Sequence, residues 1–220
     1  MDAARILAHN SKGAAQRADT GQTCPTSGLA GWVIKLKHPS NREFFAYWDK
    51  ARGTSAAPDR SNLAPEPVRS LLGDIFVLAY DPAAGYPFRV AGTRICARLG
   101  RDVKGESFSA LFTGEAHQEI EDLLGIVAEE TMPTVAGVTA ATSEGGLVHF
   151  ELLLLPFSHR AHTPLSLTGQ MAALTDAPGT LTRFGLTSWR HLEPEMQPRG
   201  PRILRKMEIA RGFMVYEGLR

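Results

Sequence analysis

The fold is decided by residues 74–112, which read DIFVLAYDPAAGYPFRVAGTRICARLGRDVKGESFSALF. This stretch begins with an unbroken apolar run at 75–80 that is too short for an ordinary helix and rich in strand formers. Such a run predicts a strand buried on both faces. Residues 81–85 supply turn chemistry, and residues 88–91 alternate like a second strand. The stretch therefore predicts a hairpin of two neighbouring strands.

Helices are predicted directly after this hairpin. Thr93 can cap a short helix that closes at Gly100, and residues 108–112 would carry Phe and Leu on one face of a second short helix. Residues 115–130 form the longest helical pattern, with an apolar inner face and a mostly acidic outer face.

Three more strands are predicted at 134–142, 147–155 and 165–173. The last one alternates apolar or small residues with Ser, Thr and Gln, which indicates a half-buried strand of defined register. Two strands, helices and then three antiparallel strands make an α/β domain of the α+β type with a five-stranded sheet.

Several short motifs lie in and before the deciding stretch: Pro58-x-Arg60, Pro65, Leu71-Leu72, Ile75-Phe76 and FRVAGTRI at 88–95. The most specific is G-T-R followed by a short helix and L-G-R-D at 99–102. Together they resemble a family of small, mostly stand-alone bacterial PAS-like proteins, the fifth PAS fold family, long carried as a domain of unknown function. The resemblance covers roughly residues 40–174, and Ala64 departs from it where an acidic residue is expected. It implies the strand order 2-1-5-4-3 and a general signalling role, without a particular ligand.

Three parts are predicted along the chain. Residues 1–38 lack sustained periodicity and predict a disordered leader, and residues 39–176 form the PAS-like domain. Residues 177–220 form a C-terminal extension, in which 184–192 favours an added strand and 203–214 a short helix.

An amphipathic helix is predicted at 40–52, with a capping-box pattern at 40–43. In PAS domains a helix at this position commonly packs on the open face of the sheet or on a partner subunit. Its aromatic residues are therefore predicted as core residues, with a dimer interface as the alternative. They are Phe44, Tyr47 and Trp48.

Composition narrows the class of protein. The chain has 220 residues, 43% hydrophobic and 21% charged, which is ordinary for a globular protein. The net charge of +1 argues against nucleic acid or an anionic membrane as partner. Cys24 and Cys96 have no metal-type spacing, and a reducing cytoplasm fits them. No apolar stretch approaches the length that a bilayer requires.

A ligand cavity is predicted between the sheet and the helices that follow the hairpin. It would be concave and mostly apolar with one polar anchor, Arg94, whose guanidinium could hold an anion. The alternative is that Arg94 belongs to a solvated basic face with Arg98 and Arg101. The lining residues would be Phe88, Val90, Arg94, Phe108, Phe112 and Leu124.

A second polar candidate is the pair His149 and Glu151, which lie two residues apart on one strand and share a side of it. Facing the cavity, they would bind a polar ligand or sense pH. The alternate residues of that strand are more apolar, so an outward orientation is favoured. No nucleophile or oxyanion-hole turn accompanies the pair, so no catalytic residue is predicted.

Cofactor motifs are weak. His117 near the start of the long helix is an isolated candidate for a haem ligand. Cys96 lies in Arg-Ile-Cys-Ala-Arg rather than in the Asn-Cys-Arg motif of flavin photosensors, so the sequence argues against both haem and flavin. His159 and His162 lack a third metal ligand nearby, so no metal site is predicted.

The sequence thus predicts a non-enzymatic, cytoplasmic PAS-type sensory module. It would bind a small molecule, a signalling protein, a second copy of itself, or several of these. A ligand-free interaction adaptor is the principal alternative, and an enzyme using His149 and Glu151 is the second. Membrane attachment is not expected. A nucleic-acid-binding role would rest on the basic tail at 199–211 alone.

Overall fold

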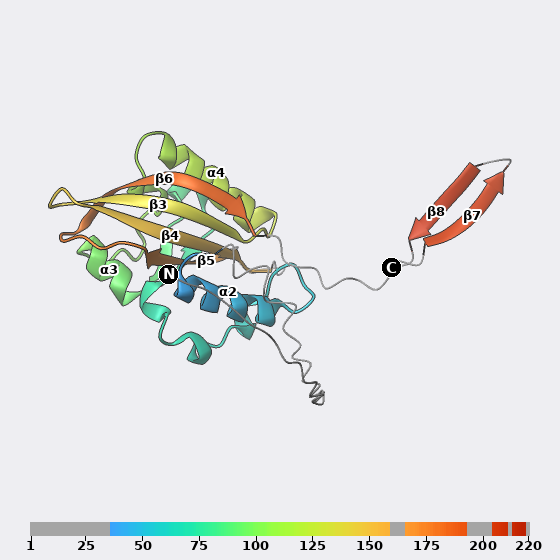
Figure 1. Cartoon of the computed structure of the whole chain (residues 1–220), viewed down its shortest axis with the longest axis horizontal. Coiled ribbons are helices and arrows are strands. Elements are labelled where there is room, and N and C mark those ends of the chain that lie inside the picture. Colours follow the sequence, from blue (N-terminus) through green and yellow to red (C-terminus); the bar gives the residue numbers. More distant parts are fainter. Residues whose placement is uncertain (1–35, 159–165, 193–203, 211–212, 219–220) are drawn as a thin grey trace, which may run out of the picture.

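The computed structural model describes residues 36–158, 166–192, 204–210 and 213–218 (Figure 1). No helix in those ranges is both long and apolar enough to cross a bilayer. The main helices are α2 (Pro39–Arg52), α3 (Thr93–Leu99) and α4 (Glu115–Glu129). The strands are β1 (Ile75–Ala79), β2 (Phe88–Ala91), β3 (Thr134–Thr142), β4 (Leu147–Pro156), β5 (Ser166–Ala173), β6 (Leu181–His191), β7 (Leu204–Ala210) and β8 (Phe213–Gly218).

Six strands form one antiparallel sheet in the order β2-β1-β5-β4-β3-β6. The predicted five-strand order is confirmed. The sixth strand is the one favoured at 184–192, but it begins earlier, at Leu181, and pairs with β3 along its length. It becomes the second edge of the sheet.

The sheet separates two apolar layers, because β4 is buried on both of its faces. On the inner face, Val148, Phe150, Leu152 and Leu154 pack with residues of α3 and α4. On the outer face, Leu153 and Leu155 pack with residues of α2. Figure 1 shows α4 and α2 on opposite sides of the sheet.

Helix α2 covers part of the outer face. Phe44 is 3% exposed and Trp48 is fully buried, and the Trp48 Nε1 donates a hydrogen bond to the Pro156 carbonyl over 2.9 Å. Tyr47 is half-buried and donates its hydroxyl to the Ala64 carbonyl. Phe44 and Trp48 are therefore core residues in this arrangement and are inaccessible to a partner subunit.

Two boundaries in the structure differ from those predicted. Helix α2 begins at Pro39 rather than Ser40, because His38 is the N-cap and its Nδ1 accepts from the Ser40 amide. The leader was predicted to extend through residue 38, but Leu36 is 2% exposed in the outer layer. Residues 1–35 lie outside the described residues.

The short helix predicted at 203–214 is also wrong. Strands β7 and β8 occupy this region and form a two-stranded sheet of their own. The spacing of basic residues suggested a helical face, whereas β-branched and aromatic residues such as Ile209, Val215 and Tyr216 favour strands. Similarly, residues 109–111 form a single 3₁₀ turn rather than a second short helix. The outer limits of the domain and of its extension stay predictions.

Replacing Trp48 tests the packing of α2. We expect Trp48→Ala to lower the free energy of unfolding by about 3–5 kcal/mol, because a fully buried aromatic side chain is lost. Chemical denaturation measures this change. Lys50→Ala, on the exposed side of the same helix, is the control and should change stability by no more than about 0.5 kcal/mol. A Trp48→Ala loss as small as that of the control would contradict the docking of α2.

Candidate functional site

The inner layer is a connected set of phenylalanine rings. Their centroids lie 5.2 Å apart for Phe76 and Phe108, 5.5 Å for Phe88 and Phe108, and 5.6 Å for Phe108 and Phe112. The set continues from Phe112 to Phe184 at 5.6 Å and on to Phe150 at 6.5 Å. These separations are those of rings in contact. All six side chains are at most 3% exposed: Phe76, Phe88, Phe108, Phe112, Phe150 and Phe184.

Four of the six predicted cavity residues belong to this inner layer, and two do not. Phe88, Phe108, Phe112 and Leu124 are buried together. Val90 is 51% exposed on the edge strand β2 and points away from the layer. Its placement as a lining residue was wrong because an irregularity in the pairing of β1 with β2 shifts the register between Phe88 and Val90, so the two side chains do not share a face.

Arg94 is also outside the inner layer. Its Nη2 lies 2.8 Å from Asp74 Oδ2, and its side chain is 52% exposed. A further hydrogen bond runs from Nη2 to the Ser70 carbonyl over 2.9 Å. The hydrogen bond with Asp74 raises the pKa of Arg94 above its ordinary value. The prediction that Arg94 anchors a ligand in the interior is therefore wrong.

The G-T-R motif instead joins α3 to the turn before β1. A Cβ on Gly92 would lie 2.3 Å from the Leu72 carbonyl oxygen, so the backbones meet only because residue 92 is glycine. A Cβ on Gly73 would lie 2.7 Å from the Arg94 Cζ, so the guanidinium packs directly over this glycine. The motif that identified the family thus has a structural role, which explains its position without a ligand.

His149 and Glu151 share the outer face, as their spacing predicts, but their environments differ. His149 is exposed, whereas Glu151 is 4% exposed. The Glu151 carboxylate accepts hydrogen bonds from the backbone amides of Lys37 over 2.6 Å and of His38 over 2.9 Å. It also accepts one from Asn41 Nδ2 over 3.0 Å. Glu151 therefore fastens the start of α2 to the sheet.

A pocket of about 80 Å³ lies beside Glu151 on the outer face. Its floor is Gly137, opposite a β-bulge in the pairing of β3 with β6. A Cβ at this position would lie 2.6 Å from Thr187 Oγ1, so a larger residue would crowd the bulge. The remaining lining residues are Lys37, Val135, Ala136, Phe150, Glu151, Leu174, Ser188, Trp189 and Arg190.

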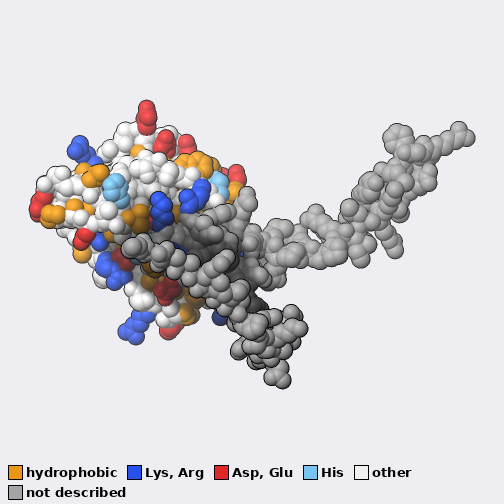
Figure 2. All heavy atoms as spheres, in the orientation of Figure 1, with side chains coloured by type: hydrophobic (Ala, Val, Ile, Leu, Met, Phe, Trp, Pro, Cys, Tyr) orange, Lys and Arg blue, Asp and Glu red, His pale blue; other side chains and the backbone are white. Residues whose placement is uncertain are grey.

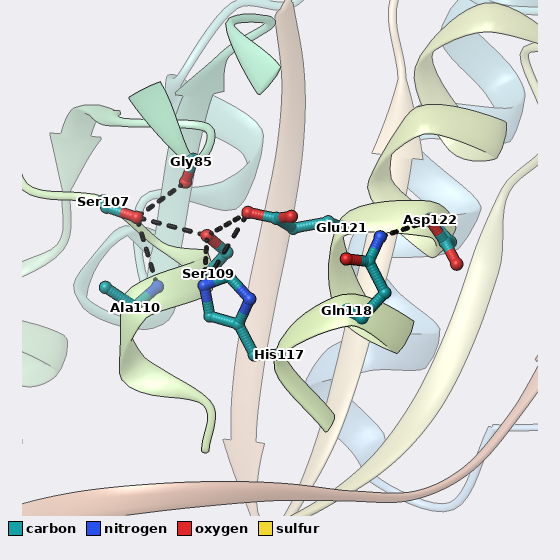
Figure 3. A network of polar contacts seen from close by, with 8 residues as sticks. All are labelled: Gly85, Ser107, Ser109, Ala110, His117, Gln118, Glu121 and Asp122. Carbon is teal, nitrogen blue, oxygen red and sulfur yellow. Dashed lines mark hydrogen bonds and ion pairs between the residues drawn. The ribbon is translucent and has the colours of Figure 1, made fainter. Parts of the chain in front are cut away.

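A third polar cluster joins the 3₁₀ turn at 109–111 to α4 (Figure 3). Ser109 Oγ donates to Glu121 Oε1 over 2.8 Å and lies 3.5 Å from His117 Nε2. The same Nε2 lies 3.8 Å from Glu121 Oε1. A catalytic triad needs the serine and the carboxylate on different imidazole nitrogens, and an accessible serine. Ser109 is 1% exposed, so the cluster ties two elements together and does not activate a nucleophile.

Metal ligands do not gather in the part of the chain that the structure describes, where no group of three or more His, Cys, Asp or Glu side chains is found. His159 and His162 lie outside that part. Cys96 is a free, half-buried thiol that packs against the inner layer.

Comparison with known proteins gives the family. A family model described as the PAS domain matches residues 36–172, which is more than half of the chain. This chain belongs to the PAS domain family. The matched range begins at Leu36, which is buried in the outer layer. No curated protein matches this PAS domain protein.

Solved structures similar to this PAS domain are distant. A LOV protein of Rhodobacter sphaeroides has 15% identity and a TM-score of 0.37, with 49% of this chain and 65% of that protein covered. The PAS domain of an HTR-like protein from Haloarcula marismortui has 16% identity and a TM-score of 0.37, with 50% of this chain and 90% of that protein covered. The PAS domain of the fruit-fly ELK potassium channel has 12% identity and a TM-score of 0.37, with 47% of this chain and 88% of that protein covered.

Glu151 offers a direct test of the outer-face geometry, with His149 as its matched control. We expect Glu151→Gln to lower the free energy of unfolding by about 1–3 kcal/mol, because a charged, buried acceptor of hydrogen bonds is lost. Hydrogen exchange at the amides of Lys37 and His38 should accelerate in the same variant. His149→Gln, on the same side of the same strand but exposed, should leave both quantities unchanged. Equal effects of the two substitutions would refute the anchoring role.

Proposed function

We propose that this PAS domain is a non-enzymatic regulatory module that acts through protein contacts rather than through a ligand held in its interior. The observation that carries the proposal is the inner layer of six phenylalanine rings in contact, which occupies the space between the sheet and the helices α3 and α4. Membership of the PAS family supports the coarser conclusion, a sensory or signalling module.

The residues of the inner layer do not fit a flavin or a haem. A flavin ring system or a haem needs a slot between the sheet and the helices, and rings such as Phe76, Phe108 and Phe112 pack directly on one another there. Haem would also need an axial ligand. The His117 imidazole lies instead at the surface, 44% exposed, beside Ser109 and Glu121. The similarity to LOV proteins therefore gives no support for a flavin in this chain.

The contact surface that we propose is the part of the outer face that α2 leaves open. It is formed by outer-face residues of β3 and β4 and by the residue after β5. Leu147 is 53% exposed and Leu174 is 41% exposed, and His149 lies between small or β-branched neighbours. Figure 2 shows hydrophobic side chains scattered over the region of β3 and β6, with Lys or Arg and His side chains among them. We call this surface the open face: Thr139, Ala141, Leu147, His149 and Leu174.

Its chemistry suits a protein partner. Mixed apolar and neutral polar groups without a dominant charge are typical of protein contact surfaces, whereas nucleic acid requires a basic surface. The partner would be a signalling protein or a second copy of the chain. An enzyme using His149 and Glu151 has no support, because the Glu151 carboxylate is fully engaged by Lys37, His38 and Asn41. The cytoplasmic location stays a prediction.

Native mass spectrometry of the purified protein tests this function. We expect the mass of the polypeptide alone, before and after denaturation, together with an absorption spectrum that contains no visible band. A discrete additional mass that is released on denaturation would overturn the proposal in favour of a ligand sensor. The same spectrum reports whether the protein is a monomer or a dimer.

Substitution in the open face tests the contact surface. Leu147→Glu should abolish dimerisation, or capture of a signalling protein, while leaving the melting temperature within about 2 °C because the side chain is already exposed. Val90 is the matched control, because it is apolar, 51% exposed and lies on the edge strand β2. Val90→Glu should leave association unchanged. Loss of association in the control alone would place the contact elsewhere.

A further inference from the structure

Strand β6 leaves one edge of the sheet open. It is the last strand in the sheet order, and it pairs with β3 on one side (Figure 1). Near its start the other side is occupied, because the Thr113 amide donates a hydrogen bond to the Phe184 carbonyl over 3.2 Å. Residues 187–190 are all exposed, and in the described part of the chain no strand pairs with them on the side away from β3. Such an edge offers unpaired backbone groups to an additional strand.

The two faces of this edge differ in chemistry. Trp189 pairs in register with Ala136 of the inner layer. Arg190 pairs with Val135 of the outer layer. Because residues that pair directly across two strands share a face, Trp189 lies on the inner side of the edge and Arg190 on the outer side. Trp189 is 47% exposed. An added strand would therefore meet an aromatic surface on one face and a cation on the other.

The pocket over Gly137 lies on the outer side of the same edge. Lys37, Ser188 and Arg190 bring two cations and a hydroxyl group to its lining. The carboxylate of Glu151 also lines it but already accepts three hydrogen bonds, and the two cations outnumber it. The volume of about 80 Å³ is roughly half that of an engineered cavity of about 150 Å³ that binds benzene. A carboxylate fits this size and charge, because it is the usual partner of Arg and Lys.

A bulge in β6 places a hydroxyl group of the edge at this pocket. The pairing passes from Val138 with Leu186 to Gly137 with Ser188, which leaves Thr187 as the extra residue. A Cβ on Gly137 would lie 2.6 Å from Thr187 Oγ1 and 3.1 Å from Ser188 Oγ, so both hydroxyl groups lie over this glycine. Bulges at sheet edges re-aim side chains in this way. The Ser188 hydroxyl, which lines the pocket, can donate to an anion there.

We propose that the open edge of β6 binds an extended segment of another protein and that the pocket over Gly137 receives a carboxylate side chain of that segment. The partner strand alternates, with Asp or Glu facing Lys37 and Arg190 and apolar residues facing Trp189. A second copy does not supply this chemistry, because β6 contains no acidic residue and would bring another Arg190 to the same face. The inference goes beyond the proposed function, since it concerns the edge of the sheet rather than the open face.

NMR titration of the full-length chain tests this site with three probes. They are acetate, a capped hexapeptide that alternates Val with Thr and carries one central Glu, and the same peptide with Gln in place of Glu. We expect the Glu peptide to shift the amide signals of residues 185–191 saturably and to bind about tenfold more tightly than the Gln peptide, because a charge-assisted contact is lost. Arg190→Gln should remove this preference for Glu. Arg183→Gln, exposed on the same strand but outside the pocket lining, is the matched control and should keep it.

Four results would overturn the proposal. Saturable shifts with acetate but with neither peptide would assign the pocket to a small free carboxylate. Equal binding of the two peptides would show strand pairing without a carboxylate site, and no saturable shift with any probe would exclude both. A dimer whose interface protects the amides of residues 185–191 from hydrogen exchange would assign the edge to a second copy. None of these results changes the outcome expected for Leu147→Glu in the open face, so the two proposals fail separately.

Discussion

Contact between phenylalanine rings in the inner layer is the constraint on which the rest of this PAS domain depends. Phe76 of β1, Phe88 of β2 and Phe108 contact one another pairwise, and Phe112 continues the contacts to Phe184 of β6. The rings connect the first hairpin, the turn before α4 and the last strand. Closely packed interiors resist changes of volume. The function that we propose therefore assigns signalling contacts to the outer face rather than to an enclosed ligand.

The outer face carries helix α2 on one part and is open on another. Helix α2 is held there by apolar packing of Phe44 and Trp48 and by the carboxylate of Glu151, which binds the first turn. Beyond α2 lie the pocket over Gly137 and the open face. Leu36 and Leu192 are buried in the same layer, so both ends of the domain lie on this side of the sheet.

Residue patterns predicted the strands, the long helix and most of the inner layer, because period and hydrophobicity are local properties of sequence. The two faces of β4 were also predictable. The difference between His149 and Glu151 was not, because the partners of Glu151 are backbone amides more than a hundred residues away in sequence. Arg94 was misplaced for a related reason: its motif is real, but its partner Asp74 lies in a turn whose position depends on the tertiary fold. The pocket depends on a bulge, which leaves no simple pattern in the sequence.

Xenon uptake tests the central claim, a filled inner layer, most directly. Xenon enters pre-formed apolar cavities, and methyl chemical shifts in NMR report its site. For the native chain we predict no saturable shift at the inner-layer methyl groups of Leu124 and Leu152, and a clear shift in a Phe112→Ala variant whose cavity is created by truncation. Saturable xenon binding among these residues in the native chain would contradict the account, because it would reveal a ligand cavity where the rings are in contact.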